Sequence, residues 1–273
     1  MRILLVLLAA CGTGDHGGRA AATTPAHRIV SLSPAVTELL FAIGAGDRLV
    51  GRTTWCDYPP EARHVPSVGD GLNPNLEAVI AARPDLVVLY RSALNESAAA
   101  RLQGMGIRAM VLPQDRLDEL AAAARLLGRL TDREQAGDSV ADAIARVRGA
   151  AAPDLGMRIA IIAWDNPPMV IGGRSYLDEL ATLAGARNVF HDLGSADVVS
   201  VETIVARDPD VLVVLSDSTS TRGPDLAGRR SWQAVRAVRE RRIATLNWSL
   251  FGRPSPRVGQ AVATFRRVLE ATR

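Results

Sequence analysis

The sequence predicts an α/β fold of two Rossmann-like lobes with mostly parallel sheets, joined by one long connecting helix, with a ligand cleft between the lobes. Three observations support this prediction. Short runs of Val, Ile and Leu alternate with helical patterns, segments of the first half recur in the second, and a long amphipathic pattern separates the halves. Such alternation is typical of parallel α/β sheets.

Seven apolar runs are predicted as strands, and most are uninterrupted rather than alternating with polar residues. Uninterrupted runs are expected where helices cover both faces of a parallel sheet. The predicted strands are 28–33, 49–54, 86–90, 108–112, 158–164, 211–216 and 242–247. Helices are expected between them, because Ser33-Pro34 and Ser255-Pro256 each supply an N-cap followed by proline at the first helical position.

Two stretches of the first half recur in the same order in the second half. LEAVIAARPDLVVL (76–89) aligns with VETIVARDPDVLVVL (201–215), glutamate on glutamate and Pro-Asp on Pro-Asp. More loosely, TELLFAIGAGDRLV (37–50) resembles DELATLAGARNVF (178–190). Repeated units in one order indicate two lobes of similar architecture.

The stretch between the two repeats predicts the helix that joins the lobes. Ala136, Val140, Ile144 and Val147 recur at helical spacing, with polar residues elsewhere. The predicted division is a first lobe at 25–131, a connecting helix at 132–151 and a second lobe at 152–273. A helical joint is stiffer than a few crossing strands, so a large hinge closure is not expected.

The first residues have the pattern of an export signal. Arg2 precedes an apolar run, and small residues precede Cys11. The stretch LAAC resembles a bacterial lipobox, which implies that Cys11 is lipidated and anchors the protein to a membrane; an ordinary secretory signal is the alternative. A Gly-, Ala- and Thr-rich stretch follows, so 1–24 is assigned to a signal and a flexible tether.

The composition is that of a globular protein that does not bind nucleic acid. The chain has 273 residues, is 48% apolar and carries a formal net charge of +3. Every basic residue is Arg, and the arginines are scattered rather than gathered in a stripe.

Aromatic residues gather at the predicted strand ends. Trp55, Tyr90, Trp164 and Trp248 each lie at or just beyond one. Because ligands bind outside the carboxyl ends of parallel strands, we expect one aromatic-lined cleft suited to a bulky, flat, partly apolar ligand. Rings that merely cap the core are the alternative. The candidate ligand-binding residues are Trp55, Asp57, Tyr58, Tyr90, Trp164, Trp248, Phe251 and Arg253.

No catalytic motif accompanies these aromatics. HExxH, CxxC, Walker and GxSxG patterns are all missing from the sequence, so neither an enzyme nor a catalytic cofactor is predicted. Cys56 and His64 are speculative metal ligands. The favoured alternatives are a small buried residue for Cys56 and a surface position for His64.

Together, these features resemble a family of substrate-binding proteins. The family is the helical-backbone class that serves ABC importers for cobalamin, siderophores and haem. The resemblance is carried by RIVSLSPAVTELLFAIGAGDRLVG (28–51), WCDYPPEA (55–62), NPNLEAVIAARPDLVVL (73–89) and FGRPSPR (251–257). WCDYPPEA and the closing SPR look most like the cobalamin-binding branch.

The resemblance implies a non-catalytic, monomeric protein in the periplasm or on the outer face of the cytoplasmic membrane. It implies capture of cobalamin or a related corrinoid and delivery to an ABC permease dimer with its ATPase subunits. It also implies that Glu77 and Glu202 dock into arginine pockets on the two permease subunits. Two solvated glutamates at helix starts are the alternative.

Other ligands stay open. Close cobalamin binders carry further aromatics in two loops, whereas the corresponding stretches 68–72 and 195–199 have none. Haem or a ferric siderophore is therefore an alternative. Haem would need Tyr58, Tyr90 or His64 to coordinate its iron. A metallocluster or chelatase-type enzyme domain is a more distant alternative, because it needs several Cys or His ligands.

Overall fold

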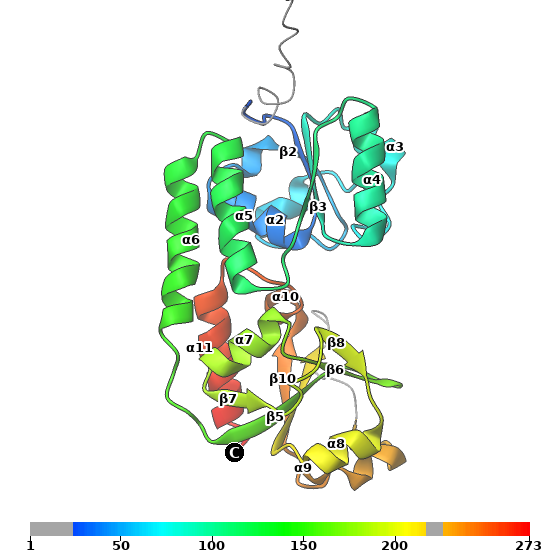
Figure 1. Ribbon diagram of the computed structural model, residues 1–273, viewed down its shortest axis with the longest axis vertical. Coiled ribbons are helices and arrows are strands. Elements are labelled where there is room, and N and C mark those ends of the chain that lie inside the picture. Colours follow the sequence, from blue (N-terminus) through cyan, green and yellow to red (C-terminus); the bar gives the residue numbers. More distant parts are fainter. Residues whose placement is uncertain (1–23, 217–225) are drawn as a thin grey trace, which may run out of the picture.

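Two α/β lobes lie one above the other in this computed structural model, which describes residues 24–216 and 226–273 (Figure 1). The upper lobe has a four-stranded parallel sheet of order β2-β1-β3-β4. The lower lobe has a mixed six-stranded sheet of order β10-β9-β5-β6-β8, with β7 paired to β5. The predicted signal segment and Cys11 lie outside the described residues. Among these, no helix has the length and apolar character needed to cross a membrane.

The elements of the upper lobe follow the predicted alternation of strand and helix. They are β1 (Ile29–Leu32), α2 (Pro34–Ala42), β2 (Leu49–Arg52), α3 (Leu76–Ala81), β3 (Leu86–Tyr90), α4 (Ala93–Gly104) and β4 (Ala109–Leu112). Two short 3-10 helices, Gly46–Arg48 and Pro60–His64, lie before and after β2. Two longer helices then lead to the lower lobe: α5 (Leu117–Leu130) and α6 (Glu134–Gly149).

The lower lobe contains three strands that the sequence did not predict. Its elements are β5 (Met157–Asp165), β6 (Pro168–Ile171), α7 (Tyr176–Leu183), β7 (Ala186–Asn188), β8 (Ala196–Val198), α8 (Val201–Arg207), β9 (Val211–Ser216), the 3-10 helix Arg230–Ala234, α9 (Arg236–Arg239), β10 (Ile243–Asn247), α10 (Trp248–Phe251) and α11 (Val258–Glu270). Strands β6, β7 and β8 are short, and β6 and β8 run antiparallel to their neighbours, so this sheet is mixed.

Buried side chains form three clusters, and the largest extends through both lobes. Two clusters cover the outer faces of the sheets, one in each lobe. The third covers the inner faces, contributed by β1 and β3 above and by β5 and β9 below, and includes α2, α5, α7 and α11. Alternate residues of one strand enter different clusters, as Ile161 and Ile162 do. Helices on both faces explain the uninterrupted apolar runs.

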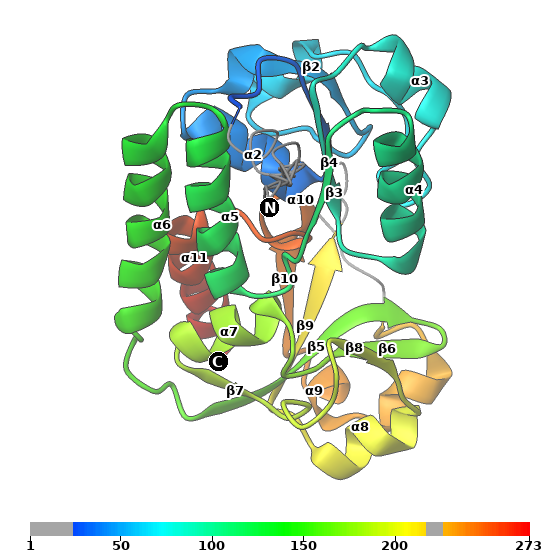
Figure 2. The same ribbon diagram turned by 45° about the horizontal axis from the view of Figure 1, so that its top comes forward.

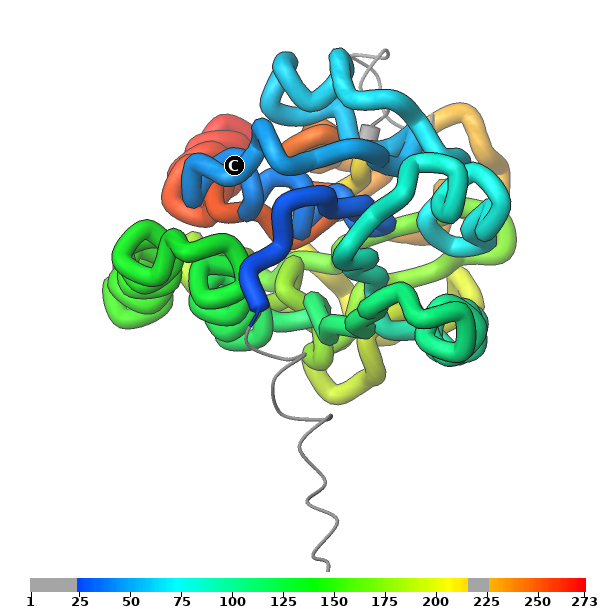
Figure 3. The backbone as a smooth tube through the Cα atoms, turned by 90° about the horizontal axis from the view of Figure 1, so that it is seen from above, coloured from blue at the N-terminus to red at the C-terminus, as the bar shows by residue number. Residues whose placement is uncertain are grey.

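The connecting helix α6 is one half of a helical hairpin rather than an isolated strut. It packs along α5 in the upper lobe and contacts α11 in the lower lobe (Figures 1 and 3). At Gly128 and Gly137 the two helix backbones approach so closely that a Cβ on Gly137 would lie 2.7 Å from the Ala124 carbonyl oxygen. A tightly packed hairpin fits the expected stiffness of the joint.

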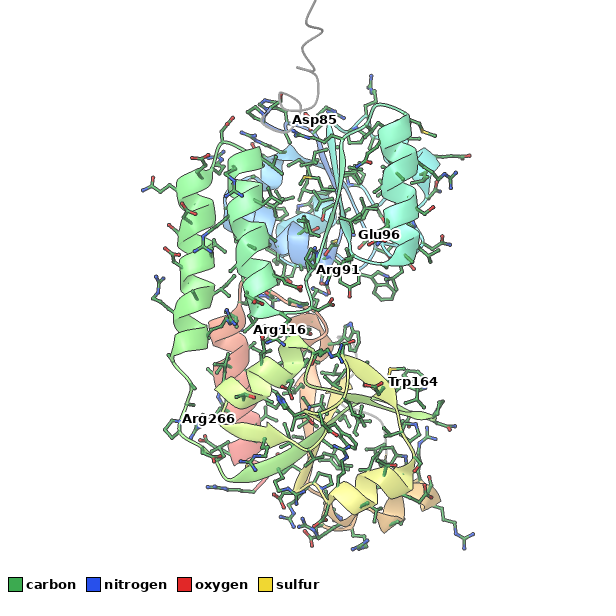
Figure 4. All side chains as sticks on the ribbon, viewed as in Figure 1. Asp85, Arg91, Glu96, Arg116, Trp164 and Arg266 are labelled. Carbon is green, nitrogen blue, oxygen red and sulfur yellow. The ribbon has the colours of Figure 1, made fainter. Side chains whose placement is uncertain are left out.

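The internal repeat is visible as the same hydrogen-bond arrangement between an aspartate and an arginine at the start of the first strand of each lobe. The Asp85 carboxylate accepts from the Arg28 backbone N–H at 3.1 Å, and Asp210 accepts from that of Arg158 at 2.9 Å. Each arginine side chain also donates to two carbonyls in the loop before the partner strand. Figure 4 shows Asp85 at the end of the upper lobe that is remote from the other lobe.

Candidate functional site

A cavity of about 530 Å³ lies between the two lobes, on the side where the strands of the upper lobe end. The upper lobe lines it with Leu32, Ser33, Pro34, Ala35, Thr53, Trp55, Asp70, Gly71, Leu72, Tyr90, Gln114 and Asp115, and the lower lobe with Ser175, Tyr176, Ser195, Trp248, Gly252, Arg253 and Pro254. Figure 2 shows α5, α6 and α11 closing one side of the space between the lobes. This volume is typical of a small-molecule site.

Four aromatic side chains line the cavity. The sequence predicted Trp55, Tyr90 and Trp248, and the structure brings all three together there. It missed Tyr176, because that residue begins a helix instead of ending a strand. A usable signal was the N-cap Ser175 after two glycines, since helix N-termini also face the ligand edge of α/β folds.

Trp164 does not line this cavity, contrary to prediction. Strand β5 continues through Asp165 into a hairpin with β6, and this hairpin carries the Trp164 ring to the outer edge of the lower lobe (Figure 4). The ring is 61% exposed, and its indole N–H donates to the Asn166 carbonyl at 3.0 Å. Trp164 is therefore not part of the cavity wall.

Phe251 is also placed elsewhere than predicted. It is fully buried in the shared core, where its ring meets that of Phe265 edge to face at a centroid distance of 5.8 Å. Its backbone carbonyl accepts a hydrogen bond from the Tyr176 hydroxyl. Phe251 thus supports the cavity wall from behind and does not line it.

Arg253 lines the cavity, but its charge is already paired. Its guanidinium contacts Asp57 and donates from Nε to Glu38 at 3.1 Å. Burial by itself would lower the pKa of Arg253, but the charges of Asp57 and Glu38 outweigh burial and raise it. Arg253 therefore stays protonated and is neutralised inside the protein.

Asp57 and Tyr58 lie behind the lining rather than in it. Asp57 pairs with Arg253, and the Tyr58 ring lies under the Arg257 guanidinium at 3.7 Å from the ring centroid. The two motifs WCDYPPEA and FGRPSPR, distant in sequence, therefore meet in space. The predicted roles of Asp57 and Tyr58 as direct ligand contacts are not supported by this geometry.

Tyr90 forms a hydrogen-bonded pair with an acid in the cavity wall. Its hydroxyl donates to the Asp115 carboxylate at 2.6 Å. Burial, the hydrogen bond and the charge of Asp115 together raise the pKa of Tyr90 to about 12. At neutral pH the phenol is protonated and committed to Asp115.

The speculative metal ligands are not brought together. Cys56 is fully buried, with its sulfur 3.1 Å from the hydroxyl oxygens of both Thr37 and Thr53, and His64 is exposed at the end of a 3-10 helix. Across residues 24–216 and 226–273, no group of three or more His, Cys, Asp or Glu side chains is arranged to hold a metal ion. The surroundings of Cys56 favour the packing interpretation.

Glu77 and Glu202 occupy equivalent positions on α3 and α8. Each is exposed in the first turn of its helix, behind a side-chain N-cap from Asn75 or Ser200. Backbone and Ser200 hydrogen bonds lower the pKa of Glu202. Each helix follows within a few residues a segment that lines the cavity, Gly71 and Leu72 before α3 and Ser195 before α8.

Two α/β lobes joined by a helical hairpin, with an aromatic-lined cavity between them, have the architecture of ligand-binding proteins of the helical-backbone type. The comparisons agree: residues 29–249 match the periplasmic binding protein family, and the chain belongs to it. It is a substrate-binding component of an ABC importer and not an enzyme, so the metallocluster or chelatase alternative is set aside.

The chain is similar to several characterised proteins. It is 30% identical to the vitamin B12-binding protein of Salmonella paratyphi A, over 85% of this chain and 86% of the relative. The structure of the periplasmic vitamin B12 binding protein BtuF of Vibrio cholerae matches with a TM-score of 0.74 and 25% identity, over 91% and 98% of the two chains. The haem-binding protein RhuT from Roseiflexus matches with 0.75 and 25%, over 90% and 99%.

Proposed function

We propose that this protein captures cobalamin or a related corrinoid outside the cytoplasm and delivers it to its ABC permease. The observation that carries the proposal is the charge of the cavity wall. Among the described lining residues the one cation, Arg253, is neutralised, while Asp70 and Asp115 add carboxylates. Similarity to vitamin B12-binding proteins supports the same ligand class.

This wall suits a ligand without exposed anionic groups. The periphery of a corrinoid is rich in neutral amides, which can hydrogen-bond to Ser, Gln and Asp side chains such as Ser33, Gln114 and Asp70. Its flat, partly apolar body can lie against Trp55 and Trp248. Haem propionates and acidic siderophores need cations, and the described lining offers them no unpaired one.

Iron coordination is also disfavoured by the state of the aromatic hydroxyls. A tyrosinate ligand must lose its proton, yet Tyr90 has a raised pKa and donates to Asp115. Tyr58 is stacked on Arg257, and His64 is not part of the cavity wall. Of the three candidates for haem ligation, none presents a free ligand atom to the cavity.

Calorimetric titration of the purified protein tests the ligand assignment. Cyanocobalamin is expected to bind tightly, while haemin and a ferric hydroxamate bind weakly or not at all. Absence of cyanocobalamin binding at concentrations up to about 100 μM would refute the corrinoid assignment. Tighter binding of haemin than of cyanocobalamin would favour the haem alternative.

Delivery is proposed to use Glu77 and Glu202, one on each lobe. An importer permease with two-fold symmetry can receive the same charge from each pseudo-repeated lobe. Replacing both, Glu77→Lys with Glu202→Lys, is expected to abolish uptake and leave ligand affinity intact. Glu96→Lys, at another exposed helical glutamate near the start of α4, is the control. Normal uptake by the double variant would contradict the docking role.

We also propose that Cys11 carries a lipid that keeps the protein, as a monomer, at the outer face of the cytoplasmic membrane. The support is the lipobox-like LAAC and the tether-like composition that follows it. Mass spectrometry of protein purified from its native membrane is expected to show a diacylated cysteine as the first residue. An unmodified Cys11 would contradict the anchor.

A further inference from the structure

Glu38 is a buried carboxylate whose hydrogen bonds all cross to the other lobe. It lies on α2 in the upper lobe, and its side chain is 1% exposed. Its two oxygens accept from Arg253 at 3.1 Å, from Ser255 at 2.5 Å and from two nitrogens of Arg257 at 2.8 Å each. Buried acids are rare unless they are paired, so this position has a specific partner set.

The surroundings of Glu38 balance its charge. Two guanidiniums, Arg253 and Arg257, face two carboxylates, Glu38 and Asp57, and the Tyr58 ring covers Arg257. The pairing of Arg257 with Glu38 is bidentate, which restricts direction as well as distance. The cluster is therefore a directional connection and not a diffuse attraction between the lobes.

The Glu38 cluster is connected to the cavity by the lower-lobe segment to which it is hydrogen-bonded. Arg253 and its neighbours Gly252 and Pro254 line the cavity, whereas Glu38 does not. Arg257 also donates to the Ser249 carbonyl at 2.9 Å, in the helix that begins with Trp248. One buried acid is thus bonded to the cation of the lower-lobe wall and, through Arg257, to the backbone of the helix that carries Trp248.

We propose that Glu38 is a positioning residue that sets the spacing of the two lobes across the cleft. The α5–α6 hairpin connects the lobes along one side, and such a connection alone leaves rotation about it possible. The shared apolar core also packs the lobes together, but it is not directional; the Glu38 cluster adds a directional attachment at Arg253, which lines the cavity, and this attachment fixes the relative position of the walls. The wall then needs little rearrangement when a ligand arrives.

The test measures lobe spacing directly, in protein without ligand. Spin labels are placed on exposed sites of the two lobes, Arg101→Cys and Ala206→Cys, in a full chain with Cys11→Ser, while the buried Cys56 stays unlabelled. Double electron–electron resonance spectroscopy is expected to give one narrow distribution of distances between the two labels in the parent protein. Glu38→Gln, which keeps the shape but removes the charge, is expected to broaden it.

A second readout is the dissociation rate of cyanocobalamin, and this part rests on the proposed function. Glu38→Gln is expected to speed dissociation at least about tenfold and to change association less, because a buried pair acts mainly on release. Glu270→Gln, which removes one acid from an exposed pair with Arg266, is the control and should change neither readout. A parent that does not bind cyanocobalamin would refute the proposed ligand and leave the spacing result valid.

An unchanged distance distribution in Glu38→Gln would overturn the proposal, whatever happens to ligand dissociation. If that variant does not fold, Ser255→Ala replaces it. It removes the hydroxyl that donates to Glu38 and accepts from the Arg257 backbone N–H and Nε, and it keeps the pairs of Glu38 with both guanidiniums. A smaller broadening is then expected. A Ser255→Ala distribution identical to that of the parent would then count against the positioning role.

Discussion

The two lobes match where their first strands begin and differ where their strands end. At the start of β1 and of β5, an aspartate from the partner strand holds the backbone N–H of an arginine, with nearly the same geometry in both lobes. At the other edge, the upper lobe ends four parallel strands at the cavity, whereas the lower lobe sends β5 into an antiparallel hairpin. The internal repeat is therefore preserved where the first strands begin and is not preserved at the edge that lines the cavity.

The lobes also differ in the charges around the shared aspartate. In the lower lobe Arg236 donates to both Asp208 and Asp210, at 2.9 Å in each case. In the upper lobe, the described hydrogen bonds to the Asp85 carboxylate come from the backbone N–H groups of His27 and Arg28 and not from an arginine side chain. Substitutions at matched positions can separate what the lobes share from what each has added.

The largest difference is expected between two exposed tryptophans. Trp55→Ala should weaken ligand binding about 10- to 100-fold, because its ring lines the cavity. Trp164→Ala should stay within about twofold of the parent, because its ring stands on the outer hairpin. Calorimetry of both variants measures this, and equal losses would show that the hairpin folds over bound ligand.

A smaller difference is expected for the two scaffold aspartates. Asp210→Ala should lower the free energy of unfolding by about 1–2 kcal/mol, allowing for its partial exposure to solvent. Asp85→Ala should lower the free energy of unfolding by less, because it does not remove a partner of an arginine side chain in the way that Asp210→Ala removes one from Arg236. Urea denaturation of each variant gives the comparison, and a larger loss from Asp85→Ala would reverse the proposed ranking.

The acid side of the stability curve offers a third comparison. The hydrogen bond from Arg236 lowers the pKa of Asp208; burial would raise the pKa of Asp210, but bonds from Arg236 and Arg158 outweigh it. Lowered folded-state pKa values give stability that is present above the unfolded pKa, about 3.9, and lost as pH falls through the folded values. In Arg236→Gln, the free energy of unfolding should therefore fall less steeply as the pH drops below about 4. An unchanged slope in denaturation midpoints would contradict this.

The smallest effects are expected from the two cavity tyrosines. Tyr176→Phe should cost about 1 kcal/mol of stability, because the Phe251 carbonyl loses its hydroxyl donor. Tyr90→Phe should cost less, since Asp115 lies 3.8 Å from Arg91 and keeps that charge nearby. Thermal unfolding of both variants tests the order. Tyr90→Phe should also remove the phenol that ionises near pH 12, seen by ultraviolet titration.

Most of the fold could be predicted from the sequence because its signals are local. Apolar runs mark the strands that helices cover on both faces, and the aligned Pro-Asp pairs precede equivalent strands β3 and β9. The three short strands escaped prediction because they are only three or four residues long. Strand β6 also begins at a proline, a residue that counts against a strand in any sequence pattern.

The site was less predictable, because its arrangement depends on distant parts of the chain. Strand-end position located Trp55, Tyr90 and Trp248 but could not show that β5 turns away with Trp164. The role of Glu38 had no local signal at all. It sits in the apolar run of α2, and its partners lie more than two hundred residues further on.

The hydrophobic cluster that extends through both lobes has a consequence for folding. Since α5, α7 and α11 share one core, neither lobe can lose its packing without exposing apolar surface of the other. We expect a single calorimetric transition in place of two, with a midpoint that rises as ligand is added. Quality control in the cell would then encounter either an intact binder or a fully unfolded chain, and rarely a half-folded one.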